Sequence, residues 1–128
     1  AAGSPAEDDG SLQAYEIYGM KLKRTRVAVL SACQTGVERS YQGEGAIGIA
    51  RSFISAQVPV VVASLWPVDS DRTAPLMIKF HHYRHVQGLS SAEALRRAQR
   101  DMLVDADERL RTPYAWASFV VYGGHANF

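Results

Sequence analysis

Apolar residues gather in three runs along this chain, and polar residues with glycine or proline separate the runs. The runs are RVAVLSA (26–32), VPVVVASLW (58–66) and YAWASFVVYG (114–123). The first two scarcely alternate between apolar and polar residues, which is typical of strands that are buried on both faces of a sheet. The third carries bulky aromatic residues. The pattern therefore predicts three strands.

Apolar residues between these strands recur at helical spacing. The predicted helices span residues 11–22, 44–57, 71–87 and 90–106. Ser11 would cap the first helix, and Gly19 would end it. Pro75 falls in the first turn of the third helix, where proline is tolerated, and Ser90 or Ser91 would cap the fourth helix.

The order of these elements predicts the fold class. Strands that are joined through helices usually lie parallel in one sheet, so we predict an α/β fold with a mostly parallel sheet. Residues 1–10 are predicted to form a loop or linker, and residues 107–113 a loop before the last strand. Three strands make a thin sheet, and its two apolar strands need neighbours on both sides. We therefore expect further strands, or another chain, to complete the sheet.

Composition narrows the class of protein. The chain has 128 residues, 47% of them hydrophobic and 21% charged, which is enough for one domain with a core. Its net charge of +1 gives no electrostatic case for nucleic acid or for an anionic membrane. No apolar run approaches the roughly 20 residues that span a bilayer, and no signal peptide is recognisable. One cysteine cannot form an internal disulfide, so we expect a cytoplasmic location.

Cys33, the only cysteine, comes directly after the first predicted strand. In an open parallel sheet, ligands and chemistry gather at the carboxyl ends of the strands. A thiol there can meet a substrate, and nearby main-chain N–H groups could polarise it or bind an oxyanion. Position alone favours a buried, inert thiol, because cysteine packs as a small hydrophobic residue.

Metal and cofactor sites have little support in the sequence. The chain has no second cysteine, and its four histidines, His81, His82, His85 and His125, stand far from Cys33. His81 and His85 are spaced as two ligands on a helix would be, but no local carboxylate supplies a third. A solvated helix face explains them better. We expect no metal and no cofactor.

Four segments together resemble a known family. VAVLSACQTG, GEGAIGIARSF, VVVASLWPVDSD and YAWASFVVYG look like the successive signatures of the CHAT domain. This caspase-like peptidase domain is often found behind tetratricopeptide repeats and is related to caspases and separase. The resemblance runs from about Ser11 to about Gly123. It implies a three-layer α/β/α sandwich of the caspase-haemoglobinase type, and a cysteine endopeptidase or a relative of one.

The resemblance also implies roles for particular residues. Cys33 matches the family's nucleophile in its Ser-Ala-Cys-x-Thr-Gly motif. In such peptidases a histidine, followed by glycine at the end of the preceding strand, works with the thiol. No histidine precedes Cys33 in this sequence. We therefore expect residues 11–128 to be the C-terminal portion of a CHAT domain, incomplete on its N-terminal side and inactive alone. Its partner would be the upstream part of the domain or a second copy.

Three further residues are candidates for substrate binding. Ser31 stands where metacaspases often carry an aspartate that binds a basic side chain, so its lack of charge removes support for that preference. Packing at the strand end is the simpler explanation for Ser31. Trp66 could form an apolar wall of the substrate groove. Asp69 could contact a basic side chain, although capping of the next helix by Asp69, Ser70 or Asp71 explains this stretch more simply.

Two functions therefore remain open. The first is the nucleophile-bearing part of a cysteine endopeptidase that acts on proteins or peptides. The second is a CHAT module without catalytic activity that serves in protein–protein interaction or signalling. The position of Cys33 in the matching motif favours the first.

Overall fold

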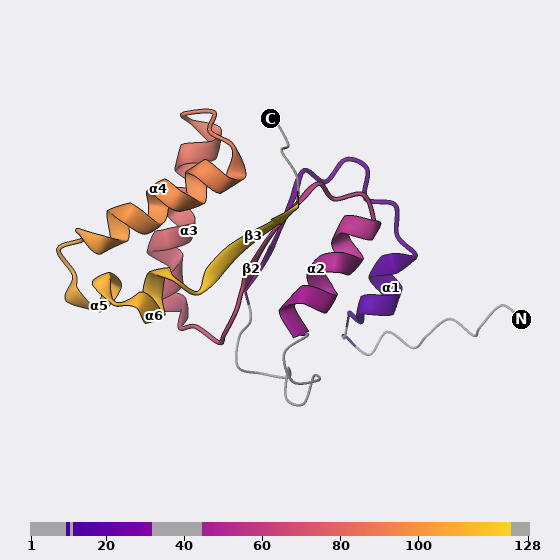
Figure 1. The fold of residues 1–128 in the computed structure, drawn as a ribbon, viewed down its shortest axis with the longest axis horizontal. Coiled ribbons are helices and arrows are strands. Elements are labelled where there is room, and N and C mark those ends of the chain that lie inside the picture. The colour runs from indigo at the N-terminus through magenta and orange to yellow at the C-terminus, as the bar shows by residue number, and fades with distance from the viewer. Residues whose placement is uncertain (1–9, 11, 32–44, 124–128) are drawn as a thin grey trace, which may run out of the picture.

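The computed structural model describes residues 10, 12–31 and 45–123 of the chain, with the side chains of residues 45–47 excepted. Figure 1 shows the elements in order: α1 (Ala14–Tyr18), β1 (Val27–Leu30), α2 (Gly45–Ser55), β2 (Val60–Ser64), α3 (Ser70–His85), α4 (Ser91–Leu103), α5 (Glu108–Arg111), α6 (Pro113–Trp116) and β3 (Phe119–Gly123). None of the helices in these ranges is long and apolar enough to cross a lipid bilayer.

The three strands form one mixed sheet in the order β1-β2-β3. β1 and β2 are parallel, whereas β2 and β3 are antiparallel, with Ser64 opposite Phe119. The prediction of a mostly parallel sheet was therefore wrong. The physical reason is that two long helices, α3 and α4, join β2 to β3. The second helix returns the chain to the end of the sheet where β2 finished, so β3 must run the other way.

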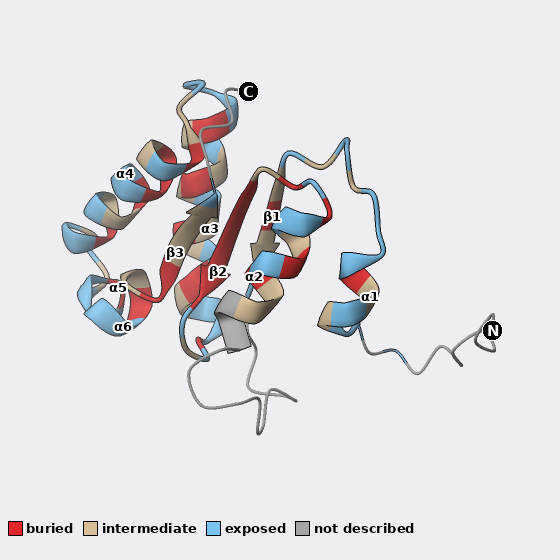
Figure 2. Cartoon of the chain, turned by 45° about the vertical axis from the view of Figure 1, so that its right-hand side comes forward, coloured by how far each residue is buried: buried red, intermediate tan, exposed pale blue. Residues whose placement is uncertain are grey.

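Helices cover both faces of the sheet (Figure 2). Successive residues of a strand point to opposite faces, so Val60 and Val62 of β2 join one core while Val61 and Ala63 join the other. The larger core lies under α3 to α6 and includes Phe80 as a fully buried side chain. All five residues of β2 are buried, as expected for the central strand. The α/β class is thereby confirmed.

The smaller core lies under α2. Ala50 and Val58 pack there against the strands, with Phe53 partly buried beside them. α1 packs against α2 through the buried Ile17. The backbone N–H of Leu22 donates to the carbonyl of Ala56 at 2.8 Å and ties the chain after α1 to the end of α2.

Several predicted boundaries agree with the structure, and one does not. Gly19 ends α1 as predicted, while Ser11 lies outside the described residues. Ser90 caps α4, because its hydroxyl accepts from the backbone N–H of Glu93 at 3.3 Å. Pro75 is the sixth residue of α3 and so lies just past its first turn, because the helix begins at Ser70, one residue earlier than predicted.

The prediction for residues 107–118 was also wrong, because two short helices replace the loop and the start of the strand. The Asp107 carboxylate accepts from the backbone N–H of Arg109 at 3.0 Å and so caps α5. Pro113 is the first residue of α6, where its fixed φ suits a helix and its missing N–H costs nothing. The last strand therefore begins at Phe119.

Candidate functional site

The carboxyl ends of β1 and β2 meet at one edge of the sheet. The two strands are parallel and in register, with Leu30 opposite Ala63. The Ser64 hydroxyl donates a long hydrogen bond of 3.5 Å to the carbonyl of Leu30 and links the two strand ends. Ser31 follows β1 directly and is exposed at this edge. Cys33 comes two residues later but lies outside the described residues, so its role as nucleophile stays a prediction.

Trp66 and its neighbour Leu65 begin the loop that follows β2. The indole of Trp66 is only partly exposed and packs against the larger core. Its Nε1 atom is buried without a hydrogen-bond partner among the described residues. Leu65 is the more exposed of the two, at 48%, and its N–H donates to the carbonyl of Ser118 at 2.7 Å. Leu65 is thus an apolar surface at this edge that the sequence did not single out.

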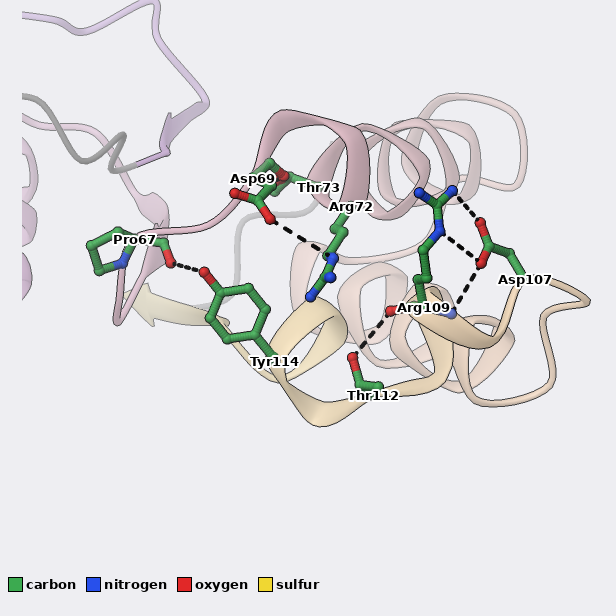
Figure 3. Close-up of polar contacts among 8 residues, drawn as sticks. All are labelled: Pro67, Asp69, Arg72, Thr73, Asp107, Arg109, Thr112 and Tyr114. Atoms are coloured by element: carbon green, nitrogen blue, oxygen red, sulfur yellow. Dashed lines mark hydrogen bonds and ion pairs between the residues drawn. The ribbon is translucent and has the colours of Figure 1, made fainter.

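Asp69 stands at the N-cap position of α3, as its place in the sequence indicated. Its backbone carbonyl, rather than its carboxylate, accepts from Arg72 N at 3.1 Å and from the backbone and hydroxyl of Thr73. The carboxylate makes no capping bond. Figure 3 shows it beside the guanidinium of Arg72. The carboxylate lies 3.8 Å from Arg72 Nε, and its side chain remains 65% exposed. A carboxylate so weakly held can still meet a ligand.

Tyr114 holds the loop after β2 in place, and sequence reasoning missed it. Its hydroxyl donates to the carbonyl of Pro67 at 2.9 Å (Figure 3). The guanidinium of Arg72 lies 5.4 Å from the centre of its ring, within the range of a cation–π contact. Tyr114 therefore connects α6, the start of α3 and the loop. Its predicted place in a strand concealed this, since the contact depends on α6.

The described histidines lie away from this edge. α3 begins directly after the loop, and His81 comes eleven residues after Ser70, which is about 16 Å further along a helix. His81 stacks on His85 with ring centres 6.0 Å apart. Burial, with Arg84 and His85 nearby, lowers the pKa of His81. Among the described residues, no three His, Cys, Asp or Glu side chains are grouped as a metal site. His125 lies outside the described residues.

These features define an α/β domain whose candidate site lies at the carboxyl edge of a parallel strand pair. The family model of the CHAT domain matches residues 2–124, so the chain belongs to the CHAT domain family. The resemblance noted in the four segments is thereby confirmed, and it makes this a caspase-like, peptidase-related domain. Comparisons with curated proteins and with solved structures find no match.

Proposed function

We propose that this CHAT domain is the nucleophile-bearing part of a cysteine endopeptidase, with Cys33 as the nucleophile. The observation that carries the proposal is the exposed edge where β1 and β2 end side by side, because Ser31 lies there two residues before Cys33. The thiolate would attack a peptide carbonyl, and backbone N–H groups would stabilise the oxyanion. The amine then leaves with a proton, and water hydrolyses the thioester to a carboxylic acid and the free thiol.

The general base in this proposal is a histidine outside residues 1–128. Supporting this, His81, His82 and His85 all lie in the second half of α3, toward the end remote from the candidate edge. The base would come from another segment of the same domain or from a second copy of the chain. Such a segment would also complete a caspase-type three-layer sandwich around the three strands described here.

The substrate would lie along the loop after β2 in this proposal. Leu65 and Trp66 would offer apolar surface, and the Asp69 carboxylate would contact a basic side chain in competition with Arg72. Ser31, which carries no charge, would contact the substrate without selecting for a cation. Proteins and peptides are the substrate class, with no metal or cofactor taking part.

The test is cleavage of a peptide library by the full-length protein that carries this domain. Cys33→Ala and Cys33→Ser should both abolish cleavage, whereas the matched surface variant Ser55→Ala should retain it. Removing the small thiol should cost only about 1 kcal/mol of stability or less, so the variants should remain folded by circular dichroism. Folded Cys33 variants that still cleave would exclude the thiol as nucleophile. A wild-type protein that binds other proteins but cleaves none would favour the non-catalytic module.

A further inference from the structure

Asp69 holds the start of α3 through its backbone, which leaves its carboxylate outside the capping hydrogen bonds. An aspartate at an N-cap ordinarily accepts from a backbone N–H of the first turn through its side chain. In this chain the carbonyl of Asp69 accepts instead from the backbone N–H groups of Arg72 and Thr73, at 3.1 and 3.0 Å. The carboxylate makes no capping bond. It can therefore change its partner without loosening the helix.

Arg72 lies between two groups that attract a cation, the Asp69 carboxylate and the Tyr114 ring (Figure 3). Its Nε atom is 3.8 Å from a carboxylate oxygen of Asp69, which is longer than a charge-assisted hydrogen bond. Its guanidinium lies 5.4 Å from the centre of the Tyr114 ring. The hydrogen bond from the Tyr114 hydroxyl to the carbonyl of Pro67 holds that ring in place. Arg72 would therefore keep the ring contact if another cation took its place at Asp69.

From these contacts we propose that Arg72 is a specificity-determining residue, because it competes with a basic side chain of the substrate for the Asp69 carboxylate. The inference rests on the proposed function, which places a basic side chain of the substrate at Asp69. That side chain must displace Arg72 before it can pair with the carboxylate, whereas a neutral side chain displaces nothing. Arg72 therefore weakens the binding of basic substrates alone and narrows the preference for them over neutral ones.

A second cation of the same region, Arg109, is held much more firmly. Its Nε and Nη2 atoms lie 3.2 and 2.8 Å from the two carboxylate oxygens of Asp107 (Figure 3). Such a two-point contact fixes a guanidinium in place, whereas Arg72 makes a single long contact. The side chains of Arg72 and Asp69 are 34% and 65% exposed, and exposed ion pairs are individually weak. Arg72 is therefore much easier for a substrate to displace than Arg109.

The test measures binding of two fluorescein-labelled peptides to the full-length protein with Cys33→Ala, so that the outcome does not depend on catalysis. One peptide is Ala-Leu-Ala-Arg-Ala-Leu-Ala, and the other carries neutral citrulline in place of its arginine. Arg72→Gln should tighten binding of the arginine peptide by about two- to fivefold and leave the citrulline peptide unchanged. Arg72→Lys keeps the charge and should bind both peptides as the parent protein does. The matched control Arg109→Gln should also leave both affinities unchanged.

A second substitution shows whether Arg72 acts through Asp69. In Asp69→Asn the two peptides should bind equally, and adding Arg72→Gln should then change nothing. The inference is overturned if neither peptide binds, or if Arg72→Gln leaves the ratio of the two affinities unchanged.

Cleavage of the peptide library by the wild type tests the proposed function separately. If the wild type cleaves, Arg72→Gln should lower KM for the arginine peptide and leave kcat unchanged, because it removes a competitor for binding. Cleavage with an unchanged affinity ratio in Arg72→Gln would overturn the inference alone. The predicted binding without any cleavage would overturn the proposed catalysis and support the competition at Asp69.

Discussion

Two sides of the molecule differ in how many of their side chains are paired or buried. We call the side with α3 to α6 the closed side, and the side with α1, β1 and α2 the open side. All five ion pairs among the described residues lie between Asp69 and Arg111. The opposite side carries Lys21, Lys23, Arg24 and Arg26, which form no ion pair with a described carboxylate, and the exposed rings of Tyr15 and Tyr18, at 73% and 50%. The closed side thus pairs several of its own charged groups, although the buried indole Nε1 of Trp66 has no partner among the described residues. The open side offers surfaces that a partner can complete.

The largest expected difference between the two sides is in the free energy of unfolding that each loses when a phenylalanine is replaced by alanine. Phe80→Ala removes a fully buried ring from the larger core and should cost about 3–5 kcal/mol. Phe53→Ala removes the same atoms from the partly buried ring under α2 and should cost less than about half as much. Urea unfolding of both variants measures the difference. Equal losses would mean that the smaller core is as tightly closed as the larger.

Glycine substitutions should change the stability of the sheet's end and of α2 in opposite directions. Gly123 has φ of 111°, and a Cβ there would lie 2.2 Å from the carbonyl oxygen of Pro59. Gly123→Ala should therefore destabilise by at least about 2 kcal/mol. Gly48, inside α2, has open space for a Cβ, so Gly48→Ala should stabilise by about 0.5–1 kcal/mol. The measurement is the midpoint temperature of thermal unfolding. The prediction is contradicted if this midpoint shifts in the same direction in both variants.

A smaller loss of stability is expected when Tyr114, which holds the loop after β2, is changed to phenylalanine. Tyr114→Phe keeps the ring beside Arg72 but removes the hydrogen bond to the carbonyl of Pro67. The cost should be about 0.5–1.5 kcal/mol, with faster amide exchange at Leu65 and Trp66. Tyr18→Phe, at an exposed ring of the open side, should change neither stability nor exchange. A loop that exchanges equally in both variants would show that Tyr114 does not hold it.

The smallest expected effect is the pH dependence of stability that comes from Glu93. Hydrogen bonds from the side chains of Arg96 and then Arg97 lower the pKa of Glu93 from its usual 4.5 to about 2. A lowered pKa in the folded state stabilises the protein above the unfolded value, so this contribution is complete above pH 4.5 and is lost as the pH falls toward 2. Urea midpoints across this range should fall less in Glu93→Gln than in the wild type. Identical pH profiles would show that these exposed pairs contribute nothing.

The sequence predicted most of the long elements because their patterns are local. Apolar runs located all three strands, and Ser90 and Gly19 marked helix ends as capping chemistry requires. Strand direction was missed because it depends on where the chain returns after two helices, which no single run encodes. Tyr114 was missed for a similar reason, since its contact joins residues 47 apart in the chain.

The candidate site was predictable only in part. Asp69 does stand at the N-cap position of α3, but its carboxylate makes no capping hydrogen bond. It pairs with Arg72 instead, and spacing along the sequence does not show that side-chain geometry. Trp66 packs toward the core, whereas its neighbour Leu65 is the more exposed of the two. Both residues belong to one uninterrupted apolar run, so the sequence pattern could not show which of them faces the solvent. Cys33 was chosen by its motif and remains a prediction.

The central claim is that Cys33 is a nucleophile whose base lies outside this chain. Its most direct test is the pH dependence of alkylation by iodoacetamide, because the 128-residue chain has a single thiol and every adduct reports on it. We expect the rate to rise where an ordinary thiol ionises, around pH 8.5, and no cleavage of peptides by the chain alone. An alkylation rate that is already maximal near pH 6, or thiol-dependent cleavage by these residues alone, would contradict the claim.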